Sequence, residues 1–159
     1  MRRLALVLVA LGTLAARLSA QTHTDFSGKW ELDPKSIEGT PGAGSVSMTL
    51  TVTQDAKIIK VAQQAKTPMG EQATTTVYNL DGSESKNTVS NGGVTVDLTS
   101  TASWDGPVFV VKTKGELQGQ PITYVEHWSL DPDGKTLHLQ RDITGMGQSF
   151  SLKLKFNKV

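Results

Sequence analysis

The sequence predicts an all-β protein, a single antiparallel up-and-down β-barrel of about eight to ten strands. Three observations lead to this fold class. From Val46 to the C-terminus, apolar residues recur at every second position, which is the period of a β-strand. Short turn sequences that contain glycine separate the alternating runs. Apolar residues at helical spacing do not recur over a useful length after residue 20, so no long helix is expected there.

The alternation places the individual strands. Residues 46–53, 94–99 and 150–157 alternate apolar side chains with Ser, Thr, Asn or charged ones, so one face of each strand is expected to be buried and the other solvated. The same pattern predicts about nine or ten strands, near residues 26–32, 46–54, 57–64, 72–80, 84–90, 94–104, 107–115, 120–130, 135–143 and 148–158.

The connections indicate hairpins between consecutive strands. Four turn sequences tolerate the positive φ angles of tight hairpins: Asp81-Gly82, Asn91-Gly92-Gly93, Asp105-Gly106 and Asp131-Pro132-Asp133-Gly134. An open meander of this length would leave two unpaired edges, and closure into a barrel removes them. Residues 33–45 are rich in Gly and Pro, and they are predicted to form a loop over one mouth of the barrel.

Residues 1–20 have the features of a cleaved signal peptide. Arg2 and Arg3 form the basic end, residues 4–16 form a short apolar stretch, and Leu18-Ser19-Ala20 supplies small residues for cleavage after Ala20. The apolar stretch is shorter than the roughly 20 residues that cross a bilayer. The protein is therefore expected to be exported, to the periplasm or the medium.

The remaining residues, 21–159, are long enough for one domain with one core. Removal of the signal, with its three arginines, reduces 16 basic residues to 13 against 15 acidic ones, a formal charge of −2. A nearly neutral chain without a basic cluster disfavours nucleic acid as a partner and stable insertion in a membrane. The chain has no cysteine, which excludes disulfides and a lipid anchor. The oligomeric state stays open.

The segment Phe26-Ser27-Gly28-Lys29-Trp30 resembles the opening motif of the lipocalins and of their fatty-acid-binding relatives, the calycin-type barrels. Together with residues 32–36 it also resembles a group of uncharacterised exported bacterial proteins of similar length. In lipocalins the glycine lets the chain enter the barrel closely, and the tryptophan plugs one end beneath an arginine from a late strand. The resemblance implies that Gly28, Trp30 and Arg141 close the barrel below a ligand-sized cavity.

The hairpin around the Asp-Pro-Asp-Gly turn is predicted to bring two charges to the inner face. If Leu130 lies opposite Lys135, then Tyr124 lies opposite Arg141, and Glu126 is diagonal to that arginine on the same face. Because an arginine side chain spans such a separation, we predict an inward-facing ion pair between Glu126 and Arg141.

This buried pair has two interpretations. Since buried charge costs several kcal/mol unless it is paired, the pair has either a functional or a structural reason. In the first, it anchors a polar group of a ligand, and Glu126 is the better candidate. In the second, Arg141 covers Trp30 and Glu126 neutralises it. The candidate ligand-binding residues are Trp104, Tyr124, Glu126, Trp128 and Arg141, whose aromatic members could equally be ordinary core.

Metal binding and catalysis find no support in the sequence. The assumed register places His127 opposite His138 on the outer face, but two ligands without a third do not make a metal site. No Ser turn with a base behind it indicates a nucleophile. The Gly-rich segments do not lie between a strand and a helix, so no phosphate-bearing cofactor is expected.

The function that fits best is that of an exported small-molecule-binding protein, which carries a hydrophobic or amphipathic ligand or a lipid inside a lipocalin-like barrel. The alternative is a non-catalytic interaction or structural module of the cell envelope with a packed barrel. An enzyme that uses Glu126 as its acid or base is a third possibility, and a protein without catalysis is favoured over it.

Overall fold

A computed structural model of the chain describes residues 23–37, 46–68, 70–91, 93–145 and 147–159. All ten predicted strands are present, and a short 3-10 turn, η1 (Pro34–Ser36), is the one helical element of the described residues. The strands are β1 (Gly28–Leu32), β2 (Ser47–Gln54), β3 (Ile58–Thr67), β4 (Gly70–Asn79), β5 (Ser85–Asn91), β6 (Val94–Asp105), β7 (Val108–Leu117), β8 (Gln120–Leu130), β9 (Thr136–Gly145) and β10 (Gln148–Lys158).

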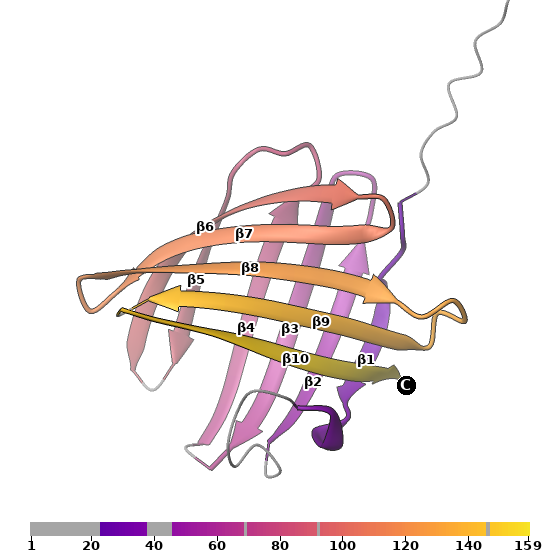
Figure 1. Ribbon diagram of the computed structural model, residues 1–159, viewed down its shortest axis with the longest axis horizontal. Coiled ribbons are helices and arrows are strands. Elements are labelled where there is room, and N and C mark those ends of the chain that lie inside the picture. The colour runs from indigo at the N-terminus through magenta and orange to yellow at the C-terminus, as the bar shows by residue number, and fades with distance from the viewer. Residues whose placement is uncertain (1–22, 38–45, 69, 92, 146) are drawn as a thin grey trace, which may run out of the picture.

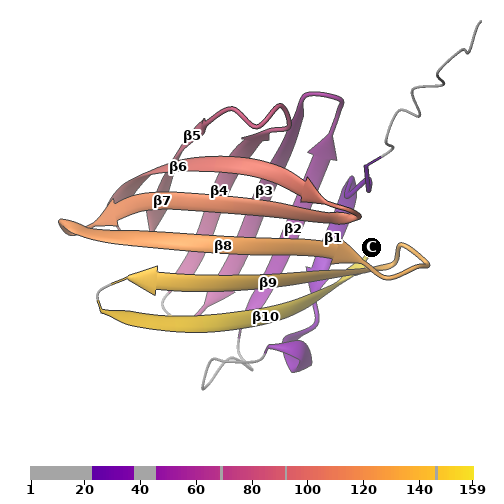
Figure 2. The ribbon, with the colours of Figure 1, turned by 45° about the horizontal axis from the view of Figure 1, so that its top comes forward.

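The strands form one antiparallel sheet with the order β4-β3-β2-β1-β10-β9-β8-β7-β6-β5. Strand β1 is hydrogen-bonded to β2 on one side and to β10 on the other, so the first and last strands meet. Because strands twist, the sheet curls into two layers. Figures 1 and 2 show β6–β10 crossing in front of β1–β5 at a steep angle. The predicted up-and-down barrel is confirmed.

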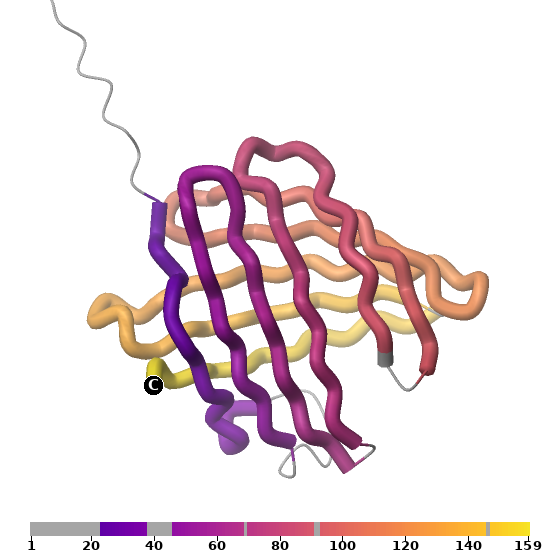
Figure 3. The backbone as a smooth tube through the Cα atoms, turned by 180° about the vertical axis from the view of Figure 1, so that it is seen from behind, coloured from indigo at the N-terminus to yellow at the C-terminus, as the bar shows by residue number. Residues whose placement is uncertain are grey.

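A seam between β4 and β5 completes the barrel without a backbone ladder. These two strands lie side by side (Figure 3), and side chains bridge them. The side-chain amide of Asn87 accepts a hydrogen bond from Val77 N (2.8 Å) and donates one to Val77 O (3.0 Å). Asn79 N donates to Ser85 Oγ (2.7 Å). Polar side chains thus replace the missing backbone pairs along this edge.

Aromatic side chains fill one end of the barrel, where the β2–β3, β4–β5, β6–β7 and β8–β9 connections lie; we call it the closed end. Phe26, Trp30 and Phe109 have no exposed surface there. The indole Nε1 of Trp30 donates to Phe26 O at 3.0 Å, which satisfies a polar group inside the core. Trp128 meets Phe26 edge-on, with ring centres 6.0 Å apart. These contacts fill the closed end with tightly packed side chains, and we call this aromatic cluster the floor of the barrel.

The lysine Lys158, and not Arg141, covers Trp30. Trp30 and Lys158 are paired across β1 and β10, and Lys158 Nζ lies 5.1 Å from the centre of the Trp30 ring. Arg141 is paired with Leu152. Leu152 lies six residues before Lys158 on β10, which corresponds to about 20 Å along the strand. The implied role of Arg141 in closure is therefore wrong, whereas Gly28 and Trp30 do lie at the closed end.

The register of the β8–β9 hairpin also differs from the expected one, by two residues. Asp131 pairs with Thr136 through its backbone (3.0 Å), so Leu130 faces Leu137 instead of Lys135. Because the shift is even, every side chain keeps its predicted face. Tyr124 then lies opposite Ile143.

The two histidines of this hairpin are not opposite each other, as the expected register required. His127 faces Gln140, and His138 faces Ser129. His138 Nε2 lies 2.9 Å from Asp131 Oδ1, a contact within the hairpin. Among the described residues, no group of three or more His, Asp or Glu side chains could hold a metal ion.

Two predictions lie mostly or entirely outside the described residues. One is the signal peptide over residues 1–20, and the other is the loop over residues 33–45, of which residues 33–37 are described. In that part, Ser36 Oγ accepts a hydrogen bond from Lys155 N at 2.9 Å, which holds η1 against β10. No described helix is long and apolar enough to cross a lipid bilayer.

Candidate ligand-binding cavity

The barrel contains a cavity of about 230 Å³ beside the aromatic floor. Side chains from β2 through β10 line it, so its shape depends on both layers of the sheet. Trp128 borders the cavity and also packs in the closed-end cluster. The cavity therefore lies between this floor and the opposite end of the barrel, where the β3–β4, β5–β6, β7–β8 and β9–β10 connections lie.

One part of the lining is apolar. Leucine, valine and phenylalanine side chains from β2, β3, β9 and β10 supply it, and they are nearly or fully buried. They are Leu50, Val61, Leu139, Leu154 and Phe156. Three of them, Leu50, Leu154 and Phe156, lie in the alternating segments 46–53 and 150–157, for which the sequence predicted one buried face.

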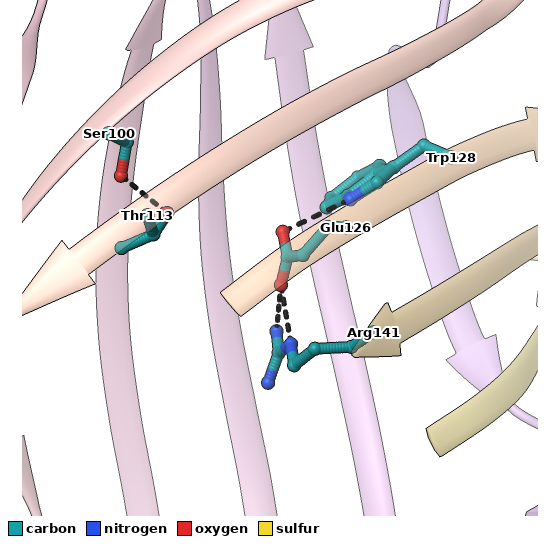
Figure 4. Close-up of polar contacts among 5 residues, drawn as sticks. All are labelled: Ser100, Thr113, Glu126, Trp128 and Arg141. Atoms are coloured by element: carbon teal, nitrogen blue, oxygen red, sulfur yellow. Dashed lines mark hydrogen bonds and ion pairs between the residues drawn. The ribbon is translucent and has the colours of Figure 1, made fainter. Parts of the chain in front are cut away.

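Another part of the lining is polar and comes from β3 to β7. Its side chains are Gln63, Gln72, Thr74, Thr76, Asn87, Ser90, Ser100 and Thr113. Ser100 and Thr113 are buried and share a hydrogen bond of 2.7 Å between their hydroxyl oxygens (Figure 4). Two hydroxyls carry two protons and their mutual bond uses one, so the pair can still donate and accept toward the cavity.

An ion pair lies between the two parts of the lining. Glu126 on β8 and Arg141 on β9 are directly opposite each other, and Figure 4 shows their side chains meeting. Arg141 Nε donates to Glu126 Oε1 at 2.5 Å, and Arg141 Nη2 contacts the same oxygen. The other oxygen, Oε2, accepts a hydrogen bond from Trp128 Nε1 at 3.2 Å. The predicted inward ion pair is confirmed, as a direct pair instead of a diagonal one.

The two charges differ in exposure. The Glu126 side chain is 4% exposed, whereas that of Arg141 is 32% exposed, so Arg141 is the partner that is more accessible to solvent. Burial is the largest single influence on the pKa of Arg141 and would lower it, but the charge and hydrogen bond of Glu126, together with Tyr78 and Tyr124, outweigh burial and raise the pKa above its ordinary value. Arg141 therefore stays charged.

The two tyrosines beside the pair stay neutral at ordinary pH. Burial, and secondarily the charge of Glu126, raises the pKa of the Tyr78 phenol far above its ordinary value of 10.0. Burial also raises the pKa of Tyr124, which is half-buried and packs against the apolar cluster of Val96, Leu98 and Ile122. Both phenols therefore offer hydrogen-bonding groups without charge.

Four of the five predicted ligand-binding residues line the cavity: Tyr124, Glu126, Trp128 and Arg141. Trp104 does not. It lies opposite Phe109 at the closed end, where its ring stacks on His23 with centres 4.4 Å apart. The inner face of β6 continues past the cavity into the floor, and Trp104 belongs to the floor. Its Nε1 is buried with no hydrogen-bond partner among the described residues.

The sequence analysis missed the polar lining. Ser and Thr form strands on either face, so their residue type does not separate the interior from the surface. A signal was nevertheless present for Ser100, which continues the inward series of Val96, Leu98 and Ala102 on β6. Asn87 offered no such signal, because its role depends on a neighbouring strand edge.

Comparison with known proteins finds solved structures of similar fold. No protein-family model matches the chain, and no curated protein does. Among solved structures, the chain is similar to the zebrafish ileal bile acid-binding protein complexed with cholic acid, with a TM-score of 0.57 and 19% identity over 84% of this chain and 98% of that one. It is also similar to secretory abundant heat soluble protein 4 from Ramazzottius varieornatus, with a TM-score of 0.55 and 21% identity over 88% of this chain and 99% of that one. At these identities the likeness shows the fold.

Proposed function

We propose that this protein binds a small amphipathic molecule inside its barrel and carries it without chemical change. The observation that carries the proposal is the cavity of about 230 Å³ with a charged pair in its wall. Protein cores are normally filled to crystal-like density, and buried ion pairs are seldom the most stable filling. A cavity that has both features is better explained by a ligand than by stability.

The fold supports the same proposal. The zebrafish structure with a similar barrel is, by its description, a bile acid-binding protein complexed with cholic acid. A barrel of this kind therefore offers an interior in which an amphipathic molecule can sit, and single-layer barrels commonly enclose one small ligand.

The other two candidate functions fit the site less well. The envelope module was expected to have a packed barrel, and the cavity argues against it. An enzyme with Glu126 as general base needs a free carboxylate oxygen, whereas Oε1 faces Arg141 and Oε2 accepts from Trp128. Both oxygens are already engaged.

We further propose that the protein works outside the cytoplasm, in the periplasm or the medium. The support is the sequence of residues 1–20, with its basic start, short apolar stretch and small residues before the cleavage position. An exported carrier would meet its ligand outside the cell or within the envelope.

The experiment is fluorescence titration with Prodan, a small uncharged dye whose emission shifts in apolar surroundings. Val89 on β5 lines the cavity, and its neighbour Thr88 is exposed on the outer face. Val89→Trp should fill the cavity and abolish the shift, whereas Thr88→Trp should bind as the parent does. A parent protein that leaves the dye emission unchanged, or a Val89→Trp variant that still binds, would refute the proposal.

A further inference from the structure

We infer that the polar part of the ligand is uncharged, a hydroxyl or amide group, and that the cavity rejects carboxylates and amines alike. This inference rests on the proposed function and adds the chemical class of the ligand. It follows from the charge balance and the hydrogen-bonding groups of the lining.

The charges of the lining cancel. Among the described residues that border the cavity, one is acidic, Glu126, and one is basic, Arg141. Their side chains are in direct contact, so neither charge lacks a partner. The two tyrosines, Tyr78 and Tyr124, are neutral at ordinary pH. The net charge that a ligand meets is zero.

A charged ligand would have to break this balance. A carboxylate that reached for the guanidinium of Arg141 would come close to Glu126, whose charge is almost wholly shielded from water. An ammonium group that reached for Glu126 would meet Arg141. Like charges repel strongly in such a setting because the surroundings are of low polarity. Each charged head would also lose its own hydration.

An uncharged polar group of a ligand finds many hydrogen-bonding partners in the lining. The Ser100–Thr113 pair keeps one proton and several lone pairs. The side-chain amides of Gln63 and Gln72 border the same cavity and have no hydrogen-bond partner among the described residues. An amide both donates and accepts, as a ligand hydroxyl does. The polar lining thus matches a head that does both.

The test uses three probes of equal chain length at neutral pH: octanol, octanoate and octylammonium. The cavity volume equals that of roughly eight water molecules, which suits a short chain. Each probe competes with Prodan for the parent protein. We expect octanol to bind at least about tenfold more tightly than either charged probe.

Two single variants change the net charge of the site in opposite directions, and a double variant removes both charges. Glu126→Gln leaves Arg141 unpaired, so octanoate should become the tightest probe. Arg141→Gln leaves Glu126 unpaired, so octylammonium should become the tightest. The double variant Glu126→Gln/Arg141→Gln has no charge and should again prefer octanol, and it keeps the test valid if one single variant does not fold.

The outcomes separate the two proposals. If Prodan does not bind to the parent, the proposed function fails. If Prodan binds and octanoate or octylammonium displaces it as well as octanol does, the function stands and the inference is overturned. Displacement by none of the three probes, with Prodan bound, likewise overturns the inference.

Discussion

The side-chain amide of Asn87 on β5 pairs with both backbone groups of Val77 on β4, in the manner of a neighbouring strand. The contact lies at the seam, the one place in the sheet where consecutive strands share no backbone ladder. Asn87 is 9% exposed, so water does not readily replace it. One side chain therefore supplies two of the hydrogen bonds that close the barrel.

Asn87→Ala should open this seam. Val77 N and Val77 O would lose their partner, and the free energy of unfolding should fall by about 2 to 3 kcal/mol. Urea unfolding measures the loss, and hydrogen exchange of the Val77 amide should become faster. The exposed neighbour gives the control, since Lys86→Ala should change stability by less than about 0.5 kcal/mol. Unchanged protection of Val77 in the Asn87 variant would contradict the assigned role.

Glu126→Gln should destabilise the protein. Arg141 would be left without its counter-charge, and we expect a loss of about 2 to 3 kcal/mol, less than for a fully buried pair because the Arg141 side chain is 32% exposed. Thermal and urea unfolding measure it. The exposed pair Glu84–Lys114 gives the control, and Glu84→Gln should cost less than about 1 kcal/mol. Equal losses of stability in the two variants would show that the interior ion pair contributes no more than an exposed one.

Gly28→Ala should weaken the closed end chiefly through its backbone. Gly28 has a φ of +142°, where other residues are strained, and an added Cβ would lie 2.8 Å from Lys158 Cε, near the flexible end of a lysine that must move aside. The expected loss is about 2 kcal/mol in urea unfolding. Gly82 has a φ of +80° with no atom within 4 Å, so Gly82→Ala tests the strain alone and should cost about 1 kcal/mol. Lys158→Ala also removes the contact with Trp30, so it is made both alone and with Gly28→Ala; it should cost less stability in the Gly28 variant than in the parent, and equal costs would argue against the contact with the added Cβ.

Tyr78 should make the fold sensitive to alkali. Its pKa is raised in the folded state, so the unfolded chain loses the phenol proton first, near pH 10. The stabilisation is complete below that pH and is lost as pH rises toward the folded pKa. Tyr78→Phe should therefore lose about 1 kcal/mol less stability than the parent between roughly pH 9 and 11. Urea unfolding at both pH values checks this.

The half-buried Tyr124 gives the comparison for this pH dependence. Its pKa is also raised by burial, but part of its ring remains in contact with solvent. Tyr124→Phe should change the alkaline response less than Tyr78→Phe does. The reverse order would show that burial is not the cause of the effect.

Local patterns in the sequence predicted the strands and their faces. An error of two residues in the β8–β9 register did no harm to the faces, because the side-chain period is two. The pair of Glu126 and Arg141 was therefore predictable. The Asp-Pro-Asp-Gly turn did not reveal the register itself, since Asp131 pairs with Thr136 and the turn comprises residues 132–135 instead of the expected 131–134.

Non-local contacts were beyond the sequence. The pairing of Trp30 with Lys158 joins the first strand to the tenth, and no turn sets its register. For this reason the sequence implied that Arg141 covers Trp30, whereas Lys158 does so in the structure. The seam at Asn87 was hidden for the same reason, because it depends on how far the whole sheet curls before its edges meet.

The meeting of β1 with β10 sets the order in which the barrel can be completed. Val159 N donates to Lys29 O at 3.0 Å, so the residue that follows β10 is bonded to the second residue of the first strand. Until β10 exists, β1 has one unpaired edge in the middle of what will become the sheet. Since contacts between strands so far apart in the sequence form slowly, this edge of β1 stays open to other partners until β10 has formed beside it.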